Sequence, residues 1–207
     1  MTDKKTVRGV SGLQAIYDNI SELYRISKAY SLEEAKSAAV SRCRKFPSIA
    51  CAVIDDFSKG RGLEVLDRIR HQISITRKFN FPVRPALDPY TSTTLNLYQL
   101  EKAEEIGRFF EYPECCVKTF VEDFKITLDQ SLLGKLGRVI NRGRECMVIT
   151  SGFVPCTLEC KKAHRSGLIV TVERDKLEQF KKLEDELFSM LPHCHPAYFR
   201  NYFEYLC

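Results

Sequence analysis

Two short segments constrain the fold more than any other feature of this 207-residue chain. Each places a proline shortly before a close pair of cysteines, in EYPECCVKTF (111–120) and in FVPCTLEC (153–160). Proline is favoured at the first position of a helix, so Pro113 and Pro155 are each predicted to start one. The two prolines are about forty residues apart in the chain. A fold that uses the four cysteines together must therefore bring these two helix starts into contact.

The first turn of a helix is a favourable place for metal-binding thiolates. Unpaired backbone N–H groups and the positive end of the helix dipole gather there and stabilise negative charge. Cys115 and Cys116 are predicted to lie in one such turn and Cys156 in the other. Cys160 and then His164 follow at intervals of four residues, which puts them on the same face of the second predicted helix. Four cysteines are the minimum set for an all-thiolate zinc site or an iron–sulfur cluster.

Several uses of these cysteines stay open. Side chains of adjacent helical residues diverge by about 100°, which suits the several irons of a cluster better than one ion. An iron–sulfur centre on Cys115, Cys116, Cys156 and Cys160 is therefore preferred, and a zinc site, in which His164 could replace Cys115, is the alternative. A third interpretation is a metal-free helical domain tied by a Cys115–Cys160 or Cys116–Cys156 disulfide. A nucleophilic cysteine paired with His164 is the least favoured interpretation.

The remaining cysteines carry weaker signals. The chain has nine cysteines, and without a secretion signal such a count favours metal binding or chemistry over disulfides. Cys43, Cys51 and Cys146 are predicted to be small core residues, and Cys207 is predicted to have no role. His193-Cys194-His195 lies between two prolines and is predicted to be a turn rather than a set of ligands.

Charge and motifs exclude more functions than they indicate. The net charge is +5, from 32 basic and 27 acidic residues, and the basic residues are spread along the chain. Solvated helix faces explain this distribution, so nucleic acid is permitted as a partner but not indicated. No apolar run is long enough for a membrane span, and MTDKKTVRGV lacks a signal core, so a cytoplasmic location is expected. The chain has no phosphate loop, GxSxG or HExxH, so no reaction, partner or oligomeric state is identified.

Hydrophobic spacing predicts a predominantly α fold with two or three minor β-strands, an α+β class with a bundle-like arrangement of helices. A capping box at Ser31 and Glu34 predicts that the first helical region divides there. The expected helices cover residues 12–30, 32–45, 63–78, 91–110, 113 onward, 128–140, 173–190 and 197–206. The expected strands cover residues 49–57, 146–154 and 168–172.

The segment NFPVRPALDPY marks the best candidate boundary because its three prolines favour an extended, irregular backbone. It predicts an N-terminal helical region (1–80), a connector (81–90) and a cysteine-containing helical domain (91–207). One compact domain overall is the alternative.

The two cysteine segments resemble the paired YPxCC and xPCxxxC blocks of an uncharacterised, largely archaeal family that carries a domain of unknown function. The resemblance covers roughly Glu101 to Gly167 and implies a cysteine-linked function without naming a reaction. That family often has histidine where this chain has Phe153, so this position is not expected to supply a ligand. A looser similarity is to the CCG modules of heterodisulfide reductases, which bind non-cubane clusters. Here valine replaces their glycine and CxxxC replaces CxxC.

Overall fold

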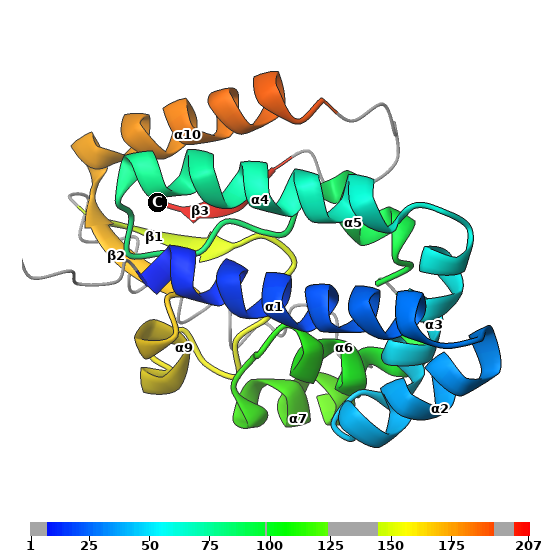
Figure 1. Cartoon of the computed structure of the whole chain (residues 1–207). Helices are drawn as coiled ribbons and strands as arrows, with labels where there is room; N and C mark the ends of the chain where they lie inside the picture. The colour runs from blue at the N-terminus through cyan, green and yellow to red at the C-terminus, as the bar shows by residue number, and fades with distance from the viewer. Residues whose placement is uncertain (1–7, 98, 124–144, 193–200) are drawn as a thin grey trace, which may run out of the picture.

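The computed structural model describes residues 8–97, 99–123, 145–192 and 201–207. Within them the chain is mostly helical and carries a small three-stranded antiparallel sheet, which confirms the predicted α+β class (Figure 1). The predicted helix at 128–140 and the segment His193-Cys194-His195 lie outside the described residues. The elements in chain order are α1 (Arg8–Ala29), α2 (Leu32–Arg42), α3 (Pro47–Ser58), α4 (Gly62–Phe79), α5 (Pro89–Thr94), η1 (Leu100–Lys102), α6 (Ala103–Phe109), α7 (Glu114–Asp123), β1 (Glu145–Thr150), α9 (Lys161–Arg165), β2 (Ile169–Glu173), η2 (Arg174–Lys176), α10 (Leu177–Met190) and β3 (Phe203–Leu206).

The largest core lies between α1, α2, α3, α4 and α6. The predicted apolar stripe of α1 is buried in it, with Leu13, Ile20 and Leu23 fully excluded from solvent. The predicted capping box starts α2, because the Ser31 N–H and hydroxyl both donate to the Glu34 carboxylate. Local signals in the sequence are thus enough to place these two helices.

The prediction of a strand at residues 49–57 is wrong, because this segment forms α3. Pro47 occupies the first turn of the helix, where its missing N–H costs nothing. The Glu105 carboxylate accepts hydrogen bonds from the N–H groups of Ser48 (2.7 Å) and Ile49 (3.1 Å). This cap comes from a residue more than fifty positions away, so the local sequence could not reveal it.

The single helix predicted over residues 91–110 is also wrong, because α5 and α6 are separate. Asp88 caps α5 by accepting a hydrogen bond from the Thr91 N–H. Shortly after α5, Asn96 adopts a left-handed conformation (φ 51°), which a continuous helix cannot contain.

The sheet has the order β2-β1-β3, and β1 pairs antiparallel with both neighbours. Successive residues of β1 face opposite sides, as the pleat requires. Val148 packs in a core with side chains of α4 and α10, whereas Met147 and Ile149 pack in a third core with Cys116. Figure 1 shows α4 and α10 on one side of the sheet and α7 and α9 on the other.

The helix predicted over residues 197–206 is wrong where the structure describes it, because Phe203–Leu206 forms β3. The buried Glu184 carboxylate of α10 accepts hydrogen bonds from the Tyr202 N–H (2.6 Å), the Phe203 N–H (3.0 Å) and the Tyr205 hydroxyl (2.7 Å). These bonds fix the backbone in an extended form beside β1.

The proline-rich segment runs through the interior. Phe81 and Val83 pack in the core beneath α10, and Asp88 is fully buried. Arg68 of α4 forms a bidentate ion pair with Asp88, at 2.7 and 3.0 Å. The division of the chain at residues 81–90 stays a prediction.

In the described ranges, none of the helices combines the length and apolarity needed to cross a membrane.

Candidate metal centre

The structure brings the sulfurs of Cys115, Cys116, Cys156 and Cys160 into one group, with all four within 4.8 Å of one another. Four of their separations are 3.7 Å (Cys116–Cys156 and Cys116–Cys160), 3.8 Å (Cys115–Cys160) and 4.0 Å (Cys115–Cys116). All four cysteines are free thiols, and the group joins two segments that are far apart in the chain. It could hold a metal ion.

The first pair of cysteines lies where the sequence predicts, in the first turn of α7. The Pro113 carbonyl accepts hydrogen bonds from the N–H groups of Cys116 (2.8 Å) and Val117 (3.0 Å), which opens the helix. Gly107 of α6 lets α7 approach closely, since a Cβ at this position would lie 2.6 Å from a methyl group of Val117. The hairpin of α6 and α7 thus fixes where the two thiols point.

The second pair is not on the predicted helix. Pro155 starts no helix, Cys156 and Cys160 lie in a loop, and α9 begins only at Lys161. Within this loop the Cys160 N–H bonds to the Thr157 carbonyl (3.1 Å), and the side chain of Leu158 is buried in the third core. The loop therefore curls toward α7, and both of its sulfurs converge on the α7 thiols.

His164 does not belong to the group of sulfurs. Its Nε2 lies 2.9 Å from the Leu158 carbonyl oxygen, so the ring is held by the backbone of the cysteine loop. The prediction that His164 extends one face with Cys156 and Cys160 fails, because the helix begins after Cys160. In this position His164 supports the loop that carries two of the thiols.

Burial and nearby N–H groups act on the thiols in different ways. Burial raises the pKa of Cys116 strongly and also raises the pKa of Cys156. Burial acts on Cys160 in the same direction, but the Ala163 N–H and the neighbouring thiols outweigh it, so the pKa of Cys160 is lowered. The Cys156 N–H also points to the Cys116 sulfur, at 3.5 Å. Cysteine binds a metal ion as the thiolate, so an ion bound here would displace the protons of those cysteines that are still protonated.

The sequence argument against a single ion does not hold in this structure. Adjacent cysteines on a helix were expected to suit one tetrahedral ion poorly, because their side chains diverge by about 100°. The sulfurs of Cys115 and Cys116 are nevertheless only 4.0 Å apart, and both lie close to the Cys160 sulfur.

Two other cysteines have a role that the sequence did not indicate. Cys146 and Cys207 form a disulfide, with Cα atoms 4.5 Å apart. They extend the β1–β3 register by one residue, since Met147 pairs with Leu206. The prediction that Cys146 is a core residue is confirmed, since it is buried, whereas the prediction of no role for Cys207 is wrong. Cys43 and Cys51 are free and half-buried, and Cys43 packs against the first core.

Comparisons with known proteins find uncharacterised relatives in methanogenic archaea. A family model described as a protein of unknown function (DUF483) matches residues 69–188, a range that contains both cysteine segments. An uncharacterized protein from Methanothermobacter thermautotrophicus is 39% identical over 163 residues, which covers 78% of this chain and 87% of the relative. Another, from Methanocaldococcus jannaschii, is 35% identical over 143 residues, covering 67% of this chain and 77% of the relative. No solved structure matches.

Proposed function

The chain belongs to the DUF483 family of proteins of unknown function, and we propose that its four-cysteine cluster holds a single zinc ion. The ligands are Cys115 and Cys116 of α7 and Cys156 and Cys160 of the following loop. The ion's role is structural, because it links α7 to the loop that connects β1 with α9.

The observation that carries the proposal is the spacing of the sulfurs. A Zn–S bond is about 2.3 Å long, so sulfurs at the corners of a tetrahedron around zinc stand roughly 3.8 Å apart. Four of the six sulfur–sulfur distances lie between 3.7 and 4.0 Å, and the other two are no longer than 4.8 Å. The sulfurs need little movement to close around one ion.

The same spacing weighs against a cubane cluster. In such a cluster each thiolate binds a different iron, and the irons and inorganic sulfides hold the thiolates well apart. Sulfurs that all lie within 4.8 Å of one another enclose too little room for that arrangement. The iron–sulfur centre preferred from the sequence remains a prediction, with the sulfur spacing favouring a mononuclear site. A single iron ion takes the same tetrahedral ligands, and elemental analysis of the purified chain distinguishes it from zinc.

A structural role follows from the number of ligands. Four protein ligands fill a tetrahedral shell, whereas catalytic zinc sites keep a position open for water or substrate. Cys116 and Cys160 are buried, and the third core surrounds them with Met147, Ile149 and Phe153. The ion would thus stabilise a core rather than face solvent.

The test compares metal content in two cysteine variants of the full chain, purified without oxygen. Cys156→Ser removes a proposed ligand, and Cys51→Ser removes a free, half-buried cysteine outside the cluster. We expect Cys156→Ser to lose most of its zinc and Cys51→Ser to keep the wild-type amount, measured by elemental analysis after dialysis. Equal zinc in the two variants would rule out the cluster as the metal site.

A further inference from the structure

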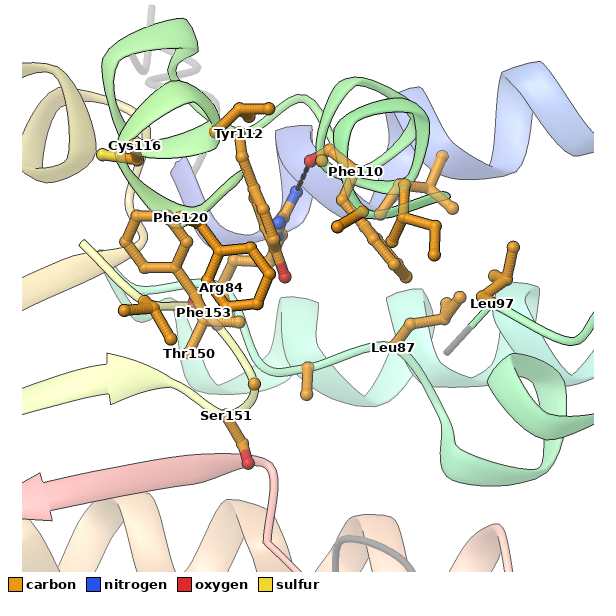
Figure 2. Close-up of a pocket in the computed structure, with 18 of the residues that line it drawn as sticks. Arg84, Leu87, Leu97, Phe110, Tyr112, Cys116, Phe120, Thr150, Ser151 and Phe153 are labelled. Carbon is orange, nitrogen blue, oxygen red and sulfur yellow. Dashed lines mark hydrogen bonds between the residues drawn. The ribbon is translucent and has the colours of Figure 1, made fainter. Parts of the chain in front are cut away.

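A cavity of about 540 Å³ lies beside the cysteine cluster, between the α6–α7 hairpin and the end of β1 (Figure 2). This volume is within the range of small-molecule sites in proteins. Its walls are mainly apolar and include the aromatic rings of Phe110, Phe120 and Phe153. Cys116 belongs both to this wall and to the cluster.

One buried cation borders this mainly apolar space. Arg84 is only 3% exposed and borders the cavity. Its Nη1 donates to the Phe110 carbonyl oxygen (2.9 Å), and its guanidinium lies 5.4 Å from the centre of the Tyr112 ring (Figure 2). A guanidinium has five N–H donors, more than the Phe110 carbonyl and the Tyr112 side chain together can take up.

Arg84 also lacks a counter-ion among the described residues. No carboxylate in that part of the chain forms an ion pair with it, in contrast to Arg68, which holds Asp88 by two bonds. Burial lowers the pKa of Arg84, and the nearby Tyr112 and Glu111 side chains oppose this without reversing it, although an arginine side chain stays charged in proteins. A buried charge without a carboxylate paired to it is costly, and among the described residues none pairs with Arg84, which favours an anionic ligand as its partner.

The position of Arg84 is fixed from several sides. The backbone N–H of Arg84 donates a hydrogen bond to the Gly167 carbonyl (2.7 Å), and the backbone carbonyl of Arg84 accepts one from the Thr150 hydroxyl (2.7 Å). Its side chain runs against α1 at Gly12, where a Cβ would lie 2.6 Å from the Arg84 Cδ. The guanidinium is therefore held in place before any ligand arrives, which lowers the entropic cost of binding.

We infer that this cavity binds a small organic carboxylate with an apolar body. The carboxylate pairs with Arg84 in the charge-assisted geometry that guanidinium groups favour, and the apolar part packs among the aromatic rings. A phosphate ester is a poorer match, because Arg84 is the one basic residue among the described lining residues and Glu204 adds a negative charge there. The ligand would lie next to Cys116 and therefore next to the cysteine cluster.

The test uses isothermal titration calorimetry on the full, metal-loaded chain. The probes are phenylacetate, 3-phenylpropionate and 4-phenylbutyrate, each compared with its uncharged amide. We expect at least one carboxylate to bind with a Kd below about 1 mM. We expect it to bind at least about tenfold more tightly than its amide, since a hydrogen-bonded charge pair discriminates by that much or more.

A pair of variants assigns the preference to one side chain. Arg84→Met removes the charge at similar volume, and Arg77→Met does the same to an exposed arginine of α4. We expect the carboxylate preference to disappear in Arg84→Met and to persist in Arg77→Met. If Arg84→Met does not fold, the comparison of acid with amide on the wild-type chain still tests whether the cavity prefers a carboxylate. Equal binding of acid and amide, or no binding by any of the three acids, would overturn the inference whichever metal fills the cluster.

Discussion

Buried charged side chains serve different purposes at the scale of single residues. Asp88 and Arg68 neutralise each other, and Glu184 accepts three hydrogen bonds that hold β3 in place. Arg84 instead faces a cavity without a counter-ion among the described residues. The first two groups hold the fold together, whereas the third is available to a ligand.

The Asp88 site yields a prediction about stability. Asp88→Ala leaves the Arg68 guanidinium partly buried without its carboxylate and removes the cap of α5. Breaking a buried pair in this way costs about 3–5 kcal/mol, so we expect a loss of that order in the free energy of unfolding in urea. The control is Asp67→Ala, which breaks an exposed ion pair with Arg70 within α4, the helix that also carries Arg68. This change should alter the free energy of unfolding little. Similar losses of stability in the two variants would show that the buried Arg68–Asp88 pair contributes little to the stability of the fold.

Single residues also show how far the sequence goes in predicting the site. The spacing of prolines and cysteines is enough to group Cys115, Cys116, Cys156 and Cys160, because it marks two similar segments. It cannot show that the second pair lies in a loop, since this depends on Leu158 packing in a core built from distant elements. For the same reason, His164 was predicted beside the sulfurs but bonds to a carbonyl of the loop instead.

Helices and strands were predictable where their signals are local. The capping box of α2, the apolar stripe of α1 and the apolar runs of β1 and β2 depend on neighbouring residues only. Glu105 caps α3 and Glu184 fixes β3 from far away in the chain, so both elements were predicted wrongly. Close contacts between elements are equally hidden in the sequence, as at the start of α1.

The start of α1 lies directly on the proline-rich segment. A Cβ added to Gly9 would be 2.4 Å from the Val83 carbonyl oxygen, which belongs to the backbone and cannot rotate away. We expect Gly9→Ala to lower the free energy of unfolding by about 1–3 kcal/mol, the usual cost of overpacking. Ser74→Ala, at an exposed position of α4, is the control and should stay within about 0.5 kcal/mol of wild type. A free energy of unfolding for Gly9→Ala equal to that of the wild type would argue against this close contact between Gly9 and Val83.

The pairing of β1 with β3 is tied by the Cys146–Cys207 disulfide. Cross-linking two points 61 residues apart restricts the unfolded chain, so Cys207→Ser should lose about 2–4 kcal/mol of stability under oxidising conditions. After reduction of both proteins with a thiol the difference should vanish. Mass mapping without reduction should find this pair and no disulfide among the four clustered cysteines. A disulfide inside the cluster would contradict the proposed metal site.

At the scale of the whole molecule, three cores are arranged around the sheet and the long helices. The first fills the helical part, the second lies between β1 and α4 with α10, and the third surrounds the cysteine cluster. In the third core α7 meets the loop before α9, and the four clustered sulfurs lie at this contact. Figure 1 shows α7 and α9 on the same side of the sheet. A metal ion there would act as a clamp between parts of the chain that are distant in sequence.

Removal of the metal should therefore weaken the fold. A ligand present at about a hundred times its Kd stabilises the folded state by about 3 kcal/mol, which corresponds to roughly 6–12 °C in a chain of this size. We expect a strong chelator to lower the thermal unfolding temperature by this order and added zinc to restore it. Cys156→Ser should unfold at the lower temperature and respond to neither treatment. An unchanged unfolding temperature after complete metal removal would show that the ion has no structural role.

The metal and labile-sulfide content of the full chain, purified without oxygen, tests the central claim most directly. A tetrahedral site on Cys115, Cys116, Cys156 and Cys160 predicts one zinc ion per chain and no labile sulfide. Iron together with stoichiometric sulfide, or four alkylatable thiols without any metal, would contradict it.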